Sequence, residues 1–319
     1  METVIAPIAQ IVPIAPIALI GLDWGSTNVR AYAFDGRGEI IDRTHSNAGA
    51  LTLKSPQQFD DALRALVGPW AQQNLAAPLI ACGMVGAKSG WREAGYVSID
   101  ADCAGGDDAQ VVALAAKAVK VDTSLGRPLT LIPGIKSDEP DVMRGEETQL
   151  VGSGLIDGMV VLPGTHCKWV QMKAGCVERF ATFYTGEMNA LIREHSSVGA
   201  LLKTAPDHDD IAAFEMGLHY ARGGAGSWLH DLFVLRASVV TGQRTEAFVS
   251  TALAGWLLGC EITAALSMYP NTRGVLLVAS DALVPWYERA TRALGVSCDA
   301  LNAEQVTARG LWRVAQRRL

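Results

Sequence analysis

The sequence LIGLDWGSTNVRAYAFD, residues 19–35, decides the fold of this chain. An apolar run, Ala18 to Asp23, ends in a cluster of small polar residues, and strand-like residues resume at Val29 to Phe34. This alternation predicts a strand, a tight turn and a second strand. A third strand is predicted over Glu39 to Arg43, after the turn Asp35-Gly36-Arg37-Gly38. The chain is therefore expected to begin with three strands joined by tight turns.

The same unit recurs in the second half of the chain. An apolar strand is predicted over Gly158 to Leu162, followed by the turn Pro163-Gly164-Thr165-His166 and by strands over Lys168 to Lys173 and Val177 to Phe180. Glycines align at one offset, because 164 − 25 and 175 − 36 both equal 139. At that offset the serine at 26 falls on a threonine, and the glutamate at 39 falls on a glutamate. Two copies of one unit predict an α/β protein of two lobes, with duplicated mixed β-sheet domains and a central cleft.

The remaining segments alternate between helical and strand-like patterns. Ser55-Pro56 supplies an N-cap and a first-turn proline for a helix. The longest helical pattern, Glu246 to Leu266, is apolar on nearly all sides, and we expect it to be buried across the domain junction. Further strands are predicted over Pro78 to Cys82, Leu129 to Ile132 and Gly274 to Ala279, and further helices over Pro285 to Leu294 and Ala303 to Arg318.

Composition excludes several classes of protein. The chain has 319 residues, of which 49% are hydrophobic and 19% charged, so it can bury a large core. Its net charge of −6 offers no basic surface for nucleic acid or an anionic membrane, and we expect neither as a partner. Six cysteines with no C-x-x-C pair predict reduced, mostly buried thiols in a cytoplasmic protein.

The apolar leader, Thr3 to Leu19, fits neither an export signal nor a membrane helix. It lacks a basic start, carries Glu2, and is interrupted by prolines at 7, 13 and 16. We expect residues 1–17 to form an irregular arm of unassigned role. Residues 18–150, joined by the terminal helix 303–319, are expected to form the first domain, and residues 151–302 the second.

The turn Asp23 to Asn28 is a candidate phosphate site. A strand that delivers a carboxylate into a turn of small hydroxylated residues can present N–H groups and hydroxyls to a phosphate tail, while the carboxylate organises Mg²⁺ directly or through water. The alternative is an ordinary hairpin turn whose Asp and Asn satisfy the local backbone. The second turn, at Gly164 with Lys168 close by, favours the phosphate interpretation, because two facing turns can clamp one polyphosphate. The chain contains neither a P-loop motif nor a dinucleotide-binding G-x-G-x-x-G after a strand.

Six strings in the chain resemble the 2-dehydro-3-deoxygalactonokinase family, also called 2-keto-3-deoxygalactonate kinase. They are LDWGSTNVRAYAFD, ACGMVGAKSGW, VMRGEETQLVG, VLPGTHCKWV, FYTGEMNALI and VLLVASDAL, and the similarity runs from about Ile20 to the C-terminus. PGTHCKW and MRGEETQ are the specific motifs, whereas DWGST alone indicates only the wider actin/hexokinase-like superfamily. The resemblance implies a two-lobed actin-like ATPase (ribonuclease H-like) fold, with ATP and Mg²⁺. It also implies phosphorylation of the 6-hydroxyl of 2-dehydro-3-deoxy-D-galactonate in galactonate catabolism.

The resemblance also implies nucleotide-binding residues. The first phosphate motif corresponds to Asp23, Gly25, Ser26, Thr27, Asn28 and Arg30, with Asp23 also the Mg²⁺ ligand. The second corresponds to Gly164, Thr165, His166 and Lys168. We expect His166 to donate to phosphate rather than to bind metal, because no second His or Cys stands at ligand spacing. The adenosine segment, Leu276 to Leu283, supplies Ala279, Ser280 and Leu283. It carries Ser280-Asp281 where the superfamily has a glycine, which leaves the adenine contacts open.

Glu146 is the predicted general base. Related sugar kinases place an acidic residue near this position, where a carboxylate can orient the attacking hydroxyl and accept its proton. The alternative is a helix N-terminus rich in acids because of the helix dipole.

Substrate contacts are predicted from both lobes. Arg144 is the first candidate for the substrate carboxylate, with Lys88, Arg193 and Arg236 behind it, and the alternative for each is a solvated surface cation. The loop Gly83 to Trp91 is expected to wrap the sugar acid through Gly83, Met84, Val85, Gly86, Lys88 and Trp91. Glu147, Thr185 and Glu187 complete the predicted set. Core packing for Trp91 and a helix cap for Glu187 are the alternatives.

Two other functions remain open at this stage. One is a kinase of the same fold that acts on another small sugar or sugar acid. The other is a nucleotide-gated, actin-like regulatory module. Epimer preference and oligomeric state, including a homodimer, are not decided by the sequence.

Overall fold

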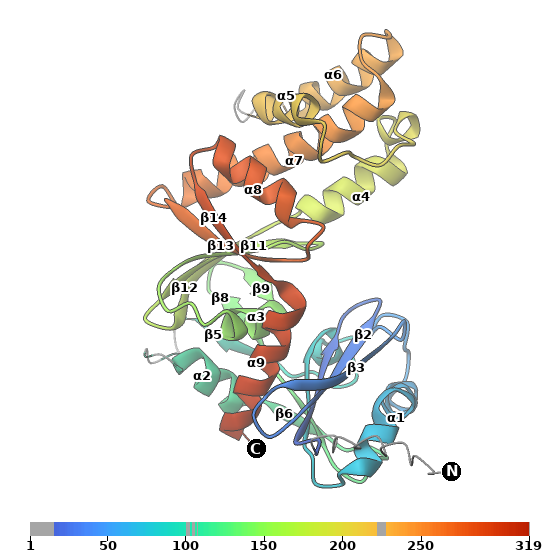
Figure 1. Cartoon of the computed structure of the whole chain (residues 1–319), viewed down its shortest axis with the longest axis vertical. Helices are drawn as coiled ribbons and strands as arrows, with labels where there is room; N and C mark the ends of the chain where they lie inside the picture. Colours follow the sequence, from blue (N-terminus) through green and yellow to red (C-terminus); the bar gives the residue numbers. More distant parts are fainter. Residues whose placement is uncertain (1–15, 100–102, 104–105, 107, 222–227, 319) are drawn as a thin grey trace, which may run out of the picture.

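The protein is an elongated molecule with two lobes (Figure 1). A computed structural model describes residues 16–99, 103, 106, 108–221 and 228–318. The strands β1 to β3 and the helix α1 lie at one end of the molecule, and the helices α4 to α7 lie at the other (Figure 1). Most of the predicted N-terminal arm, residues 1–15, lies outside the described residues.

The first lobe is built on a six-stranded sheet in the order β3-β2-β1-β4-β7-β6. β1 is antiparallel to β2 and parallel to β4, so the first three strands form a meander and β4 returns by a crossover. α1, which begins at the predicted proline after an N-cap by Ser55, packs on this sheet. The bounds are β1 (Leu19–Trp24), β2 (Val29–Phe34), β3 (Ile40–Ser46), α1 (Pro56–Gln73), β4 (Leu79–Gly83), β6 (Val119–Val121) and β7 (Leu129–Leu131).

The second lobe repeats this arrangement in a five-stranded sheet, β12-β11-β10-β13-β14. β10 is antiparallel to β11 and parallel to β13, as β1 is to β2 and β4. The predicted duplication of the strand unit is therefore confirmed, and with it the two-lobed α/β fold. The bounds are β10 (Gly158–Leu162), β11 (Cys167–Lys173), β12 (Cys176–Phe183), β13 (Gly274–Ala279) and β14 (Ser297–Asn302).

The helices α3 (Glu146–Ser153) and α9 (Ala303–Arg318) join the lobes. Their backbones are almost in contact where they cross. A Cβ on Gly152 would lie 1.8 Å from the Val306 carbonyl oxygen, and a Cβ on Gly310 would lie 1.9 Å from the Thr148 carbonyl oxygen. One apolar cluster continues from β1 and β2 through α9 to β10 and β13. The predicted domain limit after residue 150 thus falls inside α3, which is itself part of the joint.

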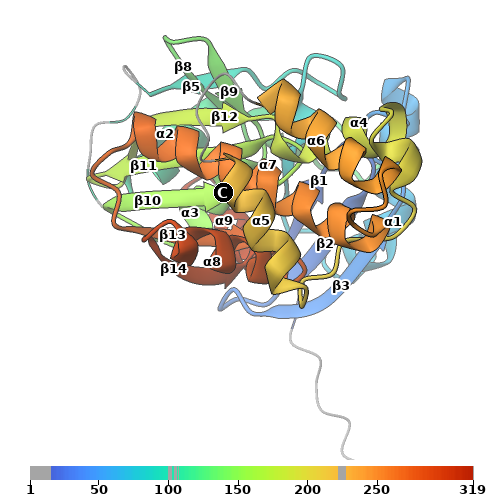
Figure 2. The same ribbon diagram turned by 90° about the horizontal axis from the view of Figure 1, so that it is seen from above.

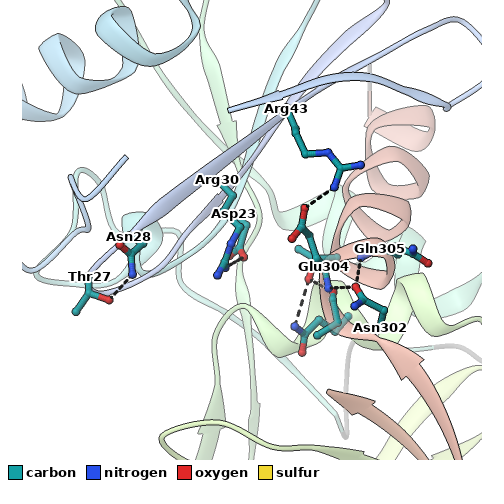
Figure 3. Close-up of polar contacts among 11 residues, drawn as sticks. Asp23, Thr27, Asn28, Arg30, Arg43, Asn302, Glu304 and Gln305 are labelled. Carbon is teal, nitrogen blue, oxygen red and sulfur yellow. Dashed lines mark hydrogen bonds and ion pairs between the residues drawn. The ribbon is translucent and has the colours of Figure 1, made fainter. Parts of the chain in front are cut away.

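Smaller elements pack beside this joint. A three-stranded sheet, β5-β8-β9, contacts β12, and α2 contacts both α9 and β12. Arg43 of β3 pairs with Glu304 of α9 at 3.3 Å (Figure 3). The bounds are β5 (Tyr96–Ser98), α2 (Ala109–Lys117), β8 (Gly134–Ser137) and β9 (Asp141–Met143).

The prediction that the long apolar helix lies across the domain junction is wrong. α7 (Glu246–Met268) packs against α4, α5, α6 and α8, all within the second lobe. A Cβ on Gly255 would lie 2.1 Å from the Phe214 carbonyl oxygen, so its small residues do permit a close approach, but to α5. α7 is long and apolar enough to span a membrane, yet 72% of that stretch is buried inside the protein, which makes it a core helix.

The other helices of this lobe surround α7. Seen from above, α7 crosses in front of the strands of the second sheet, and α5 and α6 lie beside it (Figure 2). The bounds are α4 (Thr185–His195), α5 (Ile211–Ala221), α6 (Trp228–Val240) and α8 (Val284–Ala293).

The prediction of reduced cysteines is wrong for two of the six. Cys103, between β5 and α2, forms a disulfide bond with Cys176 at the start of β12. Their separation of 73 residues concealed the pair in the sequence, where no spacing motif relates them. The other four, Cys82, Cys167, Cys260 and Cys298, are free, and two of these are fully buried.

Candidate active site

The two glycine-centred turns line one cavity of about 460 Å³ between the lobes. The first lobe contributes Asp23, Gly25 and Ser26, and the second contributes Gly164, Thr165, His166 and Lys168. Arg144, Glu146 and Met84 line the same cavity, together with Tyr96, Val142 and Gln149, which the sequence reasoning did not single out. Segments about 140 residues apart are thus brought to one crevice.

The first turn holds Asp23 at the end of β1. Arg30 Nη1 lies 3.5 Å from Asp23 Oδ2, and Asn28 donates a hydrogen bond to Thr27 Oγ1 at 3.0 Å (Figure 3). Burial raises the pKa of the Asp23 carboxyl, and the charge of Arg30 opposes that shift. Asp23 is nevertheless accessible from the cavity, because a quarter of its side chain is exposed.

A second loop, residues 49–51, is hydrogen-bonded along the first turn. Gly49 N donates to Thr27 O at 3.2 Å, Ala50 N to Gly25 O at 2.9 Å, and Leu51 N to Ser26 O at 3.0 Å. A Cβ on Gly49 would lie 2.2 Å from the Thr27 carbonyl carbon, so only glycine fits there. This loop was not predicted from the sequence, although Gly49 is a visible signal of it.

The N-terminus of α4 contacts the backbone of the second turn in a similar way. Glu187 N donates to Thr165 O at 2.9 Å, and a Cβ on Gly186 would lie 2.2 Å from the Gly164 carbonyl oxygen. His166 Nε2 lies 2.5 Å from Glu187 Oε2, and its ring packs on Tyr184 at 4.7 Å between centroids. His166 and Glu187, predicted for phosphate and substrate separately, are therefore partners of one another.

An ion pair spans the cleft between the lobes. Lys168 Nζ, from β11, lies 3.3 Å from Glu146 Oε1 at the start of α3, and it also donates to His166 O at 3.3 Å. The Lys168 side chain is only 5% exposed, whereas 24% of the Glu146 side chain is exposed. Glu146 Oε2 accepts a hydrogen bond from Arg144 N at 2.9 Å, which fixes the carboxylate at the cavity wall.

Glu147 lies behind the cavity, although it was predicted to contact substrate. Its side chain is fully buried and accepts hydrogen bonds from Gly145 N at 2.6 Å and from Thr148 Oγ1 at 3.1 Å. Burial, and then the charge of Glu146, raises the pKa of the Glu147 carboxyl to about 8. Near pH 7 this group is therefore mostly neutral.

Arg144 is held at the wall of the cavity. Its guanidinium lies over the Tyr96 ring, 4.5 Å from the centroid, and donates to Gly95 O at 2.9 Å. Among the described residues, its Nε and Nη1 have no hydrogen-bond partner. Gly86 makes room for this group, because a Cβ there would lie 3.1 Å from Arg144 Nη1.

The loop predicted to wrap the substrate only partly faces the cavity. It contains a short 3-10 helix (Met84–Gly86), in which Met84 lines the cavity and Val85 is buried. Gly83, with φ of 88°, occupies a conformation that favours glycine. Lys88 is exposed away from the cavity. Trp91 packs on the rings of Trp24 and Phe59, at 6.2 and 5.9 Å, and belongs to the core of the first lobe.

A second, mostly apolar cavity of about 160 Å³ adjoins the first. Pro163 and Gly164 line both cavities, so the second turn forms the wall between them. Of the predicted adenosine segment, Leu283 lines this cavity, whereas Ala279 is buried and Ser280 is exposed outside it. Asp281 is exposed and accepts a hydrogen bond from Asn302 Nδ2 at 2.9 Å.

Glu261, a buried carboxylate that was not predicted from the sequence, holds two residues that line this second cavity, Thr185 and Tyr287. Glu261 of α7 accepts hydrogen bonds from Trp169 Nε1 at 2.9 Å, from the Tyr287 hydroxyl at 3.1 Å, and from Thr185 Oγ1 and Cys167 Sγ. Burial raises the pKa of the Glu261 carboxyl. The carboxylate joins β11, α4 and α8 around one point, and the apolar character of α7 gave no signal of it.

Comparisons with known proteins place the whole arrangement in one family. A family model described as 2-keto-3-deoxy-galactonokinase matches residues 23–314 of the chain. A 2-dehydro-3-deoxygalactonokinase from Escherichia coli (strain K12) is 34% identical over 304 residues, which cover 93% of this chain and 97% of that protein. A crystal structure from Sinorhizobium meliloti, of a protein provisionally assigned as a 2-dehydro-3-deoxygalactonokinase, matches with a TM-score of 0.83 at 30% identity. That match covers 93% of this chain and 96% of that one. The similarity therefore spans both lobes and both turns.

Proposed function

This chain belongs to the 2-keto-3-deoxy-galactonokinase family, and we propose that it transfers the γ-phosphate of ATP to the 6-hydroxyl of 2-dehydro-3-deoxy-D-galactonate. The products are ADP and 2-dehydro-3-deoxy-6-phosphogalactonate. Membership of the family makes the protein a kinase and confirms the resemblance drawn from its motifs. The observation that carries the site assignment is the single cavity lined by Gly25 and Gly164, one from each lobe.

The nucleotide spans both cavities in this proposal. Its triphosphate lies between the turns at Gly25 and Gly164, where Lys168 lines the cavity and Arg30 is paired with the lining residue Asp23, so that both can supply positive charge. Its base lies in the apolar cavity beside Leu283, because Pro163 and Gly164 form a wall common to both spaces.

The residues at the first turn fit a magnesium ion. The Asp23 carboxylate and the Ser26 hydroxyl belong to residues that line the cavity, and Mg²⁺ prefers one or two carboxylates together with phosphate oxygens and water. Asp23 would hold the ion, directly or through water, and the ion would neutralise charge on the phosphates.

Glu146 acts as general base in this proposal. Its carboxylate stands at the cavity wall on α3, opposite the second turn, and it is fixed by the amide of Arg144. A hydroxyl placed against it is oriented for attack, and its proton passes to the carboxylate as the bond to phosphorus forms.

Arg144 holds the substrate carboxylate in this proposal. Arg144 lines the cavity, its buried Nε and Nη1 atoms have no partner among the described residues, and its plane is fixed by Tyr96 and Gly95. A planar guanidinium with donors in a fixed orientation is suited to a carboxylate. Lys168 supplies charge to the transferred phosphate from the opposite lobe.

We place the reaction in the cytoplasm, and we propose neither nucleic acid nor membrane as a partner. The small sugar acid is the acceptor.

A coupled assay for ADP release tests the function. The purified protein receives ATP, Mg²⁺ and each of the two epimeric 2-keto-3-deoxy acids, and the position of phosphate in the product is then determined. We expect turnover with the galactonate-derived acid and phosphate on the 6-hydroxyl. Turnover confined to another acceptor would refute the substrate and leave the kinase fold intact. ATP hydrolysis that is indifferent to every small acid would support a regulatory module instead.

A further inference from the structure

The second, mostly apolar cavity has few side chains that can form a hydrogen bond to a nucleotide base. Leu257, Leu283 and Trp286 are among the apolar residues that line it. Thr185 and Tyr287 also line the cavity, but both direct their hydroxyls to the buried carboxylate of α7. No charged side chain of the described residues lines it, so the cavity suits a neutral ring system rather than an ion.

Asn189 is the amide that lines this cavity. Its Oδ1 accepts a hydrogen bond from Arg193 Nε at 2.9 Å, one helical turn further along α4. An arginine N–H can only donate, so the amide oxygen must face Arg193 and the amide nitrogen must face the other way. Within the described part of the chain no hydrogen-bond partner is found for Asn189 Nδ2.

Arg193 is itself firmly anchored. Its Nη1 donates to Ser250 Oγ and its Nη2 to Ser250 O, both at 2.9 Å, and Ser250 Oγ donates to Thr204 O at 2.6 Å. Ser250 is completely buried on α7. Arg193 is also absent from the lining of the cavity between the two turns, so it is not placed to hold the substrate carboxylate there. Its hydrogen bonds give the Asn189 amide a single orientation.

We propose that Asn189 recognises the nucleotide base, with its Nδ2 donating a hydrogen bond to a ring nitrogen of adenine, and that Arg193 is the positioning residue that sets the amide. Adenine ring nitrogens are acceptors, and a buried acceptor left unpaired is costly. The inference rests on the proposed function, because it needs the triphosphate at the second turn, on the other side of the wall formed by Pro163 and Gly164.

The variant Asn189→Asp separates base recognition from a structural role. The aspartate keeps an acceptor for Arg193 and adds an ion pair, so a purely structural role predicts unchanged or higher stability. The same substitution removes the only donor of the side chain and turns an oxygen toward the ring nitrogen. Base recognition therefore predicts a loss of ADP affinity in a protein that remains folded.

Isothermal titration with ADP and with tripolyphosphate measures the effect. We expect Asn189→Asp to raise the Kd for ADP roughly 10- to 100-fold and to leave the Kd for tripolyphosphate unchanged, since tripolyphosphate has no base. Arg193→Met should raise the Kd for ADP less, because the amide remains but can turn. The matched control is Glu194→Gln, an exposed position on the same helix, which should bind ADP like the parent protein.

Two results would overturn the inference. One is an Asn189→Asp protein that binds ADP as tightly as the parent; the other is an equal loss of affinity for ADP and tripolyphosphate. Neither measurement uses the sugar acid, so a different acceptor substrate leaves the inference standing. A parent protein that binds neither ligand would instead defeat the kinase proposal and this inference with it.

Discussion

Replacing Gly186 by alanine should strongly lower kcat while the protein remains folded. Gly186 lies in the first turn of α4 and packs directly on the second phosphate turn. A Cβ there would lie 2.2 Å from the Gly164 carbonyl oxygen, 2.9 Å from Thr165 Cα and 3.0 Å from the Gly164 carbonyl carbon. All three atoms are backbone, so no side chain can rotate away to relieve the overlap.

The size of the effect follows from that overlap. Ordinary contacts of a Cβ begin at 3.4 Å, so the turn or the helix must move by about 1 Å. Overpacking of this kind costs roughly 1–3 kcal/mol of stability. A displacement of about 1 Å in a group that positions the transferred phosphate can lower turnover by about 100-fold. Catalysis should therefore suffer far more than folding.

The assay compares kcat, the KM for ATP and the thermal midpoint of Gly186→Ala with those of the parent. Gly36→Ala is the matched control, because it lies in a tight turn of the duplicated unit in the first lobe and its new Cβ would meet nothing within 4 Å. Gly49→Ala should reproduce the defect from the other lobe, since its Cβ would lie 2.2 Å from the Thr27 carbonyl carbon. A Gly186→Ala enzyme with parental kcat and KM would refute the view that the glycine braces the turn.

Three further substitutions address the acids of α3 and their cation. Glu146→Gln should lower kcat by roughly 10²- to 10⁴-fold while ADP affinity by titration stays unchanged, and near-normal turnover would remove Glu146 from the role of base. Lys168→Met, which removes the cation 3.3 Å from Glu146 in the proposed triphosphate site, should raise the KM for ATP, because the transferred phosphate loses an opposing charge. A parental KM for ATP in that variant would contradict the role of Lys168 at the phosphates. Glu147 has a folded-state pKa of about 8 against an ordinary 4.5, so the stability tied to its proton is complete below pH 4.5 and is lost as pH rises through 8. Glu147→Gln should abolish that slope, which amounts to at most on the order of 4 kcal/mol in denaturant titrations at pH 5 and pH 8, and equal slopes in both proteins would contradict it.

Local patterns in the sequence were sufficient for the repeated strands and their turns. The offset between Gly25 and Gly164 and the apolar run Gly158–Leu162 are properties of a few consecutive residues, and each has its structural counterpart. The contacts that make the turns rigid were not predictable in this way. Gly49 and Gly186 are visible as glycines, but the backbone atoms they approach lie more than 20 residues away.

The directions of the acidic side chains and the location of the long apolar helix were also not predictable from the sequence. Glu146 and Glu147 are identical in type, yet successive helical residues point about 100° apart, so one faces the cavity and the other the core. The apolar composition of α7 predicts that the helix is buried on all sides, but it does not predict against which elements. Only the tertiary structure shows that α7 is buried inside the second lobe. The spacing of Asn189 and Arg193, by contrast, is the ordinary contact distance on one helix face and could have been noticed beforehand.

The charges of the cleft explain why both lobes are needed for one reaction. Asp23 is paired with Arg30 on the same hairpin, but Glu146 of α3 is paired with Lys168 of the opposite lobe. Lys168 Nζ also lies 3.3 Å from the His166 carbonyl oxygen, within the turn assigned to phosphate. In the proposed complex the phosphoryl donor therefore lies beside the ammonium group that also holds the Glu146 carboxylate. The ion pair between the lobes thus places the proposed base next to the proposed phosphate site, and neither lobe alone supplies both groups.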